Sequence, residues 1–285
     1  MKLFDYIKSF PLYCLPQHGL TSIVYKLTRI ENKFWKNTLI NVFIKLFKVD
    51  MEQAIWSSAD HYPSFNAFFT RSLKPDARHW HKDKQSILSP VDGAISQIGK
   101  INKDILIQAK GLDYSLARLL ANDESVERFY DGHFTTLYLS PKDYHRIHMP
   151  LSGQLIRTIY VPGDLFSVNT ASVKTIDSLF ARNERFISLF DTHVGLVAQI
   201  MVGAMFVGSM ETVFAGQITP CEKREIVSKD YSNSGNIVLN QADEFGHFNM
   251  GSTVILLFEK DKISWKEDFA ENDSIQVGQH IGSLV

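Results

Sequence analysis

The chain has 285 residues, of which 45% are hydrophobic, so it holds enough apolar material for one large domain or two small ones, and disorder is not expected. Its formal net charge of −1 argues against a nucleic-acid binder that works through bulk positive charge. The two cysteines, Cys14 and Cys221, lie far apart in sequence and form neither a metal-type pair nor a disulfide framework, which favours a reducing compartment.

Helical periodicity dominates the first 60 residues. Apolar side chains recur at helical spacing in two stretches, Leu20, Ile23, Val24 and Leu27 and then Leu39, Ile40, Phe43, Ile44 and Phe47. Residues 1–50 also carry eight lysine or arginine side chains against three acidic ones. A basic helix with an apolar face can lie in the headgroup region of an anionic membrane, or it can pack on the protein body with its lysines in solvent. The two interpretations are compatible.

Beyond about residue 86, short apolar runs alternate with glycines, which predicts many short strands. One helix is expected at 115–120. The stretch 194–210 carries no charge, but its glycines and β-branched residues favour two short buried strands over a membrane span. Turns at 92–95 and 277–282 are similar to those of barrel-sandwich hybrid folds. The predicted fold class is α+β, with N-terminal amphipathic helices on a β-rich sandwich or barrel core.

The segment Met250-Gly251-Ser252-Thr253 precedes an apolar run at 254–258 that is expected to form a strand. A serine hydroxyl at this place can attack the carbonyl of the preceding glycine, which has no side chain to shield it. The attack gives an ester, elimination from the ester leaves dehydroalanine, and hydrolysis of the dehydroalanine gives ammonia and a pyruvoyl group made from the chain itself. Taken alone, Gly-Ser-Thr is a common tripeptide, and Ser252 would be an ordinary strand serine.

Two histidines, His145 and His148, stand three residues apart in the segment 140–150. This spacing could serve a metal ion, with His133 as a third ligand, or two structural histidines. Prolines bound the segment and no zinc-like set of Cys, Asp or Glu accompanies it, so we expect no metal. Asp92 precedes Gly93, a position where an aspartate most often bonds its own backbone in a turn.

These segments belong to an ordered set of motifs that closely resembles phosphatidylserine decarboxylase, the pyruvoyl-dependent bacterial type of proenzyme. The motifs cover most of the chain from about residue 60 onward and lie at 62–71, 89–94, 140–150, 161–169, 179–185, 202–209 and 250–253. The last motif usually begins with leucine in bacterial members, and Met250 replaces it with a side chain of similar volume. An ordered set of motifs is far more specific than any one of them.

The resemblance implies self-cleavage between Gly251 and Ser252, into residues 1–251 and 252–285. It assigns His148 as the base for Ser252 and Asp92 as the carboxylate that orients this base, a Ser-His-Asp triad. It implies a pyruvoyl cofactor derived from Ser252 that forms a Schiff base with the amine of phosphatidylserine. Loss of CO2 and reprotonation then yield phosphatidylethanolamine. The resemblance also assigns His145 as the donor of the proton that is delivered after loss of CO2. Ser167 is expected to line the substrate pocket.

A lipid substrate favours membrane contact for the helical region at 1–60, while residues 61–285 would form the catalytic domain. The apolar face at 39–47 is expected to enter the acyl boundary. The implied partners are phosphatidylserine, an anionic membrane surface on the cytoplasmic face of the inner membrane, the second self-cleaved chain and, as often in this family, a second copy. Two other functions remain open: a serine hydrolase, although no Gly-x-Ser-x-Gly surrounds Ser252, and a non-catalytic lipid-binding protein.

Overall fold

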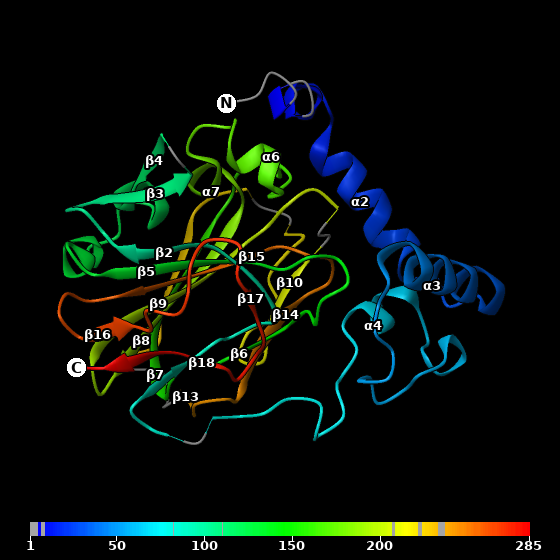
Figure 1. Ribbon diagram of the computed structural model, residues 1–285. Helices are drawn as coiled ribbons and strands as arrows, with labels where there is room; N and C mark the ends of the chain where they lie inside the picture. Colours follow the sequence, from blue (N-terminus) through cyan, green and yellow to red (C-terminus); the bar gives the residue numbers. More distant parts are fainter. Residues whose placement is uncertain are drawn as a thin grey trace.

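The computed structural model describes residues 5–6, 9–81, 83–109, 111–206, 209–221, 224–232 and 237–285. Lys2 and Lys8 of the basic N-terminal stretch, and Val207 and Gly208 of the motif at 202–209, lie outside the described residues. Figure 1 shows a β-rich body with three helices gathered along one side of it, α2 (Gln17–Leu27), α3 (Lys33–Phe47) and α4 (Phe65–Phe69).

The largest sheet has a strand from near the C-terminus in its interior. Its antiparallel order is β12, β7, β8, β9, β15, β5, β2, β17, and β13 also pairs with β7. The bounds are β2 (Gly93–Lys100), β5 (His133–Tyr138), β7 (Gly153–Val161), β8 (Arg185–Thr192), β9 (Gly195–Val202), β12 (Val227–Asp230), β13 (Val238–Leu239), β15 (Thr253–Phe258) and β17 (Ser274–Ile275). Every residue of β15 is buried. A continuous apolar run is typical of a strand covered on both faces, so the sequence of β15 matches its place.

Three smaller sheets complete the β-rich body, in the orders β11-β10-β14-β6, β1-β18-β16 and β3-β4. Their strands are β1 (Ser86–Leu88), β3 (Ile105–Ala109), β4 (Leu112–Ser115), β6 (Arg146–His148), β10 (Met210–Thr212), β11 (Gly216–Gln217), β14 (Glu244–Phe248), β16 (Ile263–Trp265) and β18 (His280–Leu284). The α+β class is confirmed. No pairing among the described strands closes a sheet into a barrel, so the sandwich-hybrid detail is not confirmed.

Short helices connect these strands, η1 (Phe10–Tyr13), η2 (Ala59–His61), α5 (Leu116–Leu119), η3 (Val126–Phe129), α6 (Thr170–Val173) and α7 (Leu179–Arg182). The helix expected at 115–120 is α5. The uncharged stretch at 194–210 contains β9 and the first residue of β10, so its prediction as strand rather than membrane span is confirmed. Within the described part of the chain, no helix is both long enough and apolar enough to cross a bilayer.

Helix α3 has clear sequence signals at both ends. The side chain of Asn32 accepts a hydrogen bond from the backbone N–H of Trp35, and Lys48 ends the helix in the left-handed conformation. One of its basic residues does not face solvent: Lys36 is buried, and its Nζ donates to the carbonyl of Ala59 at 2.9 Å. Part of the positive charge counted in the sequence therefore anchors the helix to the body.

The face of α3 that is expected to enter a membrane is mainly a packing face in this structure, and its contact with a membrane stays a prediction. Ile40 is fully buried, and its neighbours on this face are half-buried, Leu39, Phe43, Ile44 and Phe47. They cover an aromatic cluster formed by Tyr62, Phe65, Phe68 and Phe69. Helical periodicity identifies an apolar stripe, but it does not identify what covers the stripe. The exposed apolar side chains of α3 lie elsewhere on the helix and include Phe34, Val42 and Leu46.

Two substitutions on α3 should separate its packing residues from its exposed ones. Ile40→Ala removes a fully buried side chain and should lower the free energy of unfolding by about 2–5 kcal/mol, because it leaves a cavity. Leu46→Ala removes a side chain that is 70% exposed and should change it by less than about 0.5 kcal/mol. Urea unfolding of the two variants measures both values, and equal costs would contradict this packing of α3.

Candidate active site

The peptide bond between Gly251 and Ser252 lies directly before β15. Thr253 pairs with Tyr138 of β5 on one side and with Val202 of β9 on the other. The backbone N–H of Leu139 donates to the carbonyl of Ser252 at 2.9 Å, which extends the ladder by one residue. Ser252 is fully buried, and its Oγ has no hydrogen-bond partner. A rigid strand therefore holds a serine hydroxyl that no structural contact uses.

The imidazole of His145 lies beside Gly251. A Cβ added to Gly251 would stand 3.1 Å from Cε1 of His145 and 3.2 Å from the carbonyl oxygen of Leu139, closer than ordinary van der Waals contact. The His145 ring stacks on Phe69 with ring centroids 4.1 Å apart. Glycine is thus the residue that lets the histidine approach the backbone at this point.

His145 is fully buried, and neither of its ring nitrogens makes a hydrogen bond of normal geometry, although backbone groups of Ser140 and Pro141 lie close enough to raise its pKa slightly against the effect of burial. Burial, and to a lesser degree the charge of Arg71, lowers the pKa of His145 to about 3. The side chain is therefore neutral at physiological pH, and neither of its nitrogens is committed to a well-formed hydrogen bond. Buried polar atoms without partners are uncommon, and they are costly to keep in a structural role.

Both ring nitrogens of His148, in contrast, have hydrogen-bond partners. Its Nδ1 lies 2.8 Å from the carbonyl oxygen of Ala242, and its Nε2 lies 3.1 Å from the hydroxyl of Tyr144. Because a carbonyl only accepts, Nδ1 of the neutral ring carries the proton and Nε2 accepts from the tyrosine. Burial lowers the pKa of His148, which keeps the ring neutral near pH 7. Both nitrogens are thus occupied by Ala242 and Tyr144.

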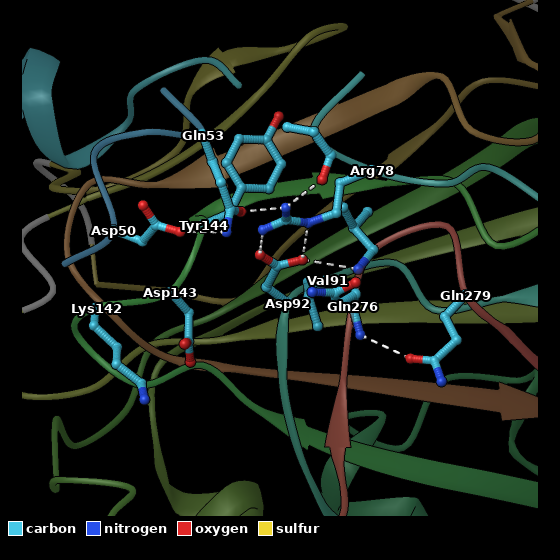
Figure 2. Close-up of polar contacts among 12 residues, drawn as sticks. Asp50, Gln53, Arg78, Val91, Asp92, Lys142, Asp143, Tyr144, Gln276 and Gln279 are labelled. Carbon is cyan, nitrogen blue, oxygen red and sulfur yellow. Dashed lines mark hydrogen bonds and ion pairs between the residues drawn. The ribbon is translucent and has the colours of Figure 1, made fainter. Parts of the chain in front are cut away.

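Asp92 is held by a buried ion pair. Arg78 donates from Nε to Oδ1 at 2.9 Å and from Nη2 to Oδ2, and the backbone N–H of Val277 also donates to Oδ1 at 2.9 Å. Figure 2 shows the Arg78 guanidinium against this carboxylate, with Gln53 on its other side.

Gly93, the residue after Asp92, allows the close approach of β2 to β5, because an added Cβ would lie 2.1 Å from the carbonyl oxygen of Tyr138.

The structure brings together only some of the residues expected to act with Ser252. Among the described residues, no hydrogen bond joins Asp92, His148 and Ser252 to one another, and the imidazole that lies against Gly251 is that of His145. The triad thus stays a prediction. Sequence reasoning missed Arg78 and Tyr144, the partners of Asp92 and His148. Tyr144 had a local signal, since it lies in the motif with both histidines.

A cavity of about 220 Å³ opens beside Gly251. Gly251 and Ser167 both line it, and the half-buried face of α3 contributes Phe43 and Phe47. Asn169 donates to Oγ of Ser167 at 3.0 Å. The cavity therefore has an apolar wall on the side of the helices and a small polar group near Gly251. Ser167 lines this cavity, and its role toward the substrate stays a prediction.

The metal alternative for the histidines has no geometric support in the part of the chain that is described. There, no three side chains of His, Cys, Asp or Glu are grouped so that they could hold an ion. His133 begins β5, whereas Tyr138, the neighbour of Thr253, ends it. Five residues of extended strand, about 17 Å, thus separate His133 from the scissile segment.

Comparisons with known proteins show the family of this chain. A family model described as phosphatidylserine decarboxylase matches residues 65–283, and a model described as PSD matches residues 7–48. A phosphatidylserine decarboxylase proenzyme of Nitrosococcus oceani is 46% identical over 285 residues, which is 100% of this chain and 93% of that protein. One of Alcanivorax borkumensis is 47% identical over 273 residues, 95% of this chain and 94% of that protein. One of Methylococcus capsulatus is 46% identical over 283 residues, 99% and 96% respectively. The chain belongs to the phosphatidylserine decarboxylase family.

Proposed function

We propose that this protein converts phosphatidylserine to phosphatidylethanolamine with a pyruvoyl group that it makes from its own Ser252. The observation that carries this proposal is the scissile segment itself. A fully buried serine without a hydrogen-bond partner follows a glycine that contacts a neutral imidazole and lines a cavity. The proenzyme names of the relatives support the same conclusion, because they denote precursors that require processing.

Self-cleavage needs a nucleophile, a base and a group that orients the base. Oγ of Ser252 attacks the carbonyl carbon of Gly251, the peptide nitrogen leaves, and an ester joins the two residues. Elimination then releases residues 1–251 with a free carboxylate, and hydrolysis of the remaining dehydroalanine gives the pyruvoyl group and ammonia. His148 serves as base in this scheme only after its Nε2 leaves Tyr144, and Asp92 orients it only if the two residues approach one another.

The site fits a pyruvoyl group, because Ser252 has no side-chain contact to lose and the cavity reaches the preceding glycine. A pyruvoyl group supplies a carbonyl that condenses with the substrate amine and accepts the electrons released when CO2 departs. His145 performs the proton transfers: as a neutral imidazole it takes a proton from the substrate ammonium, and as an imidazolium it returns a proton to the substrate carbon. Its low pKa makes the imidazolium a strong acid, which suits the second transfer, the return of a proton to carbon.

The two products of cleavage are expected to stay together. Residues 252–285 contain β15, which hydrogen-bonds to β5 and β9, and β18, which pairs with β1. These partner strands all belong to residues 1–251, so cutting one peptide bond leaves both ladders intact. A homodimer remains a further proposal, drawn from the family.

The proposed location is peripheral, on the cytoplasmic face of the inner membrane. Phe34 is 82% exposed and Leu46 is 70% exposed on α3, and Lys33 and Lys45 also lie on this helix. These side chains replace the packed face as the proposed contact with an anionic bilayer. Such a placement lets the acyl chains stay in lipid while the headgroup enters the cavity beside α3.

Replacement of the nucleophile gives the first test. Ser252→Ala should leave one intact chain without decarboxylase activity, whereas the wild type should give two chains, the smaller with a blocked N-terminus. Ser264→Ala, an exposed serine on β16, is the matched control and should process normally. Denaturing mass spectrometry reads the outcome, and an uncleaved wild-type chain that still releases CO2 from phosphatidylserine would rule out the pyruvoyl proposal.

The two histidines should have separable effects. His148→Ala should slow self-cleavage by about 10²–10⁴-fold, because the reaction loses its base, and Asp92→Asn should slow it in the same direction. His145→Ala should permit cleavage but remove decarboxylation. Time courses of processing and of CO2 release distinguish the two roles, and normal turnover in both alanine variants would refute the assignment.

Membrane contact can be tested with the exposed face of α3. Phe34→Ala combined with Leu46→Ala should weaken binding to phosphatidylserine vesicles by about tenfold or more, since both side chains would lose apolar burial. The matched control combines Ile107→Ala and Val238→Ala, which remove exposed apolar side chains from β3 and β13. Flotation at low and high salt should show binding that weakens but persists. Equal loss in both double variants would place the contact elsewhere.

A further inference from the structure

Arg71 is a buried cation that neither the triad nor the cavity accounts for. Its side chain is only 4% exposed. One nitrogen, Nη2, donates to the backbone carbonyls of Lys142 and Asp143 at 2.8 and 3.2 Å. The other two, Nε and Nη1, are buried without a partner. The Cζ atom of Arg71 lies 5.5 Å from the centroid of the Phe68 ring. Removing a guanidinium from water is costly, and the three N–H bonds of Nε and Nη1 have no hydrogen-bond acceptor, so this ring contact and a purely structural role explain the arrangement poorly.

The position of Arg71 ties it to His145 from two directions. The carbonyls that it holds belong to the two residues at 142–143, just before the histidine. Phe69, two residues before Arg71, stacks on the imidazole. The short segment 69–71 therefore fixes both the ring plane of His145 and the turn that carries it.

We infer that Arg71 is a positioning residue for His145: it anchors the turn at 142–145 and places a buried positive charge beside that turn. The inference rests on the proposed function, in which His145 exchanges protons with the substrate. Its consequence is that the buried positive charge disfavours the imidazolium, so that a proton held by His145 is given up readily to the substrate carbon.

The charges around this pair are few. Burial is the first cause of the low pKa of His145, and Arg71 is the one charged side chain that contributes to it among the described residues. Arg71 itself is faced by Tyr62, Asp92 and Asp143, which favour its charged form, and by Arg78, which opposes it. Asp92 is already paired with Arg78, and Oδ2 of Asp143 accepts from the backbone N–H of Ser140 at 2.7 Å. Neither carboxylate therefore neutralises Arg71 through a direct ion pair.

The experiment follows His145 by NMR in full-length protein with isotope-labelled histidine. A Ser252→Ala background keeps the chain in one piece, and His145→Gln assigns the resonance. Arg71→Gln removes the charge but keeps an amide donor for the two carbonyls, Arg71→Met keeps the apolar stem, and Arg71→Lys keeps the charge. Lys142→Met is the matched control, because it removes an exposed charge from the same turn.

The neutral variants should raise the protonation midpoint of His145 by about one pH unit, because a nearby positive charge has been removed. Arg71→Lys and Lys142→Met should leave it close to the parent value. In cleavable chains, the acid limb of the decarboxylation profile should move to higher pH in the neutral variants by the same interval, because His145 would become protonated earlier as pH falls.

An unmoved midpoint in a folded neutral variant would overturn the inference. So would loss of folding in both neutral variants while Arg71→Lys folds, since Arg71 would then be a structural anchor alone. The NMR measurement does not depend on turnover, so its failure is distinct from failure of the proposed function. Failure of the proposed function would appear differently: the protein would release no CO2 from phosphatidylserine, while the protonation midpoint of His145 would still shift in the neutral Arg71 variants.

Discussion

The candidate site depends on one constraint, which is that β15 is hydrogen-bonded along both edges and begins immediately after Ser252. Thr253 is paired with strands on each side, and Leu139 extends the ladder to Ser252. Such a strand fixes the backbone at Ser252 in advance. An attack of the Ser252 hydroxyl on the Gly251 carbonyl would therefore cost less conformational entropy. The same ladder explains how a chain can be cut beside its central strand without losing that strand, since all the partners of β15 lie in the larger fragment.

A second physical feature is the concentration of unsatisfied polar atoms near this strand. Oγ of Ser252, both ring nitrogens of His145, Oγ1 of Thr253 and Nδ2 of Asn249 all lack partners. Each such group costs about 1–3 kcal/mol in a structural role. The surrounding apolar packing offsets this cost: Met250 contacts both the β-rich core and the aromatic cluster under α3. The two cores thus meet at the residue before the scissile glycine, which makes the helical region part of the site.

Local patterns predicted the β-rich body, the helix α5 and the strands in the uncharged stretch, because periodicity and glycine spacing are properties of neighbouring residues. They could not predict what covers α3. That helix has apolar side chains on more than one face. The face that contains Ile40 is buried because the aromatic cluster at 62–69 packs against it, and this cluster lies further along the chain than the helix. Nor could they supply the partners of Asp92 and His148. Arg78 and the carbonyl of Ala242 reach these groups only through the fold, and motif order alone names the catalytic residues without their orientation.

The difference between the two histidines follows from their surroundings rather than from their identity. His148 has a carbonyl on one nitrogen and a tyrosine hydroxyl on the other, so its tautomer is set and any proton transfer requires it to exchange a partner. His145 has no well-formed hydrogen bond to exchange, and stacking on Phe69 fixes its ring while leaving both nitrogens uncommitted. A group that acts once, during processing, can tolerate a costly rearrangement. A group that acts in every turnover benefits from being held ready, which is the physical reason to place the repeated proton transfers on His145.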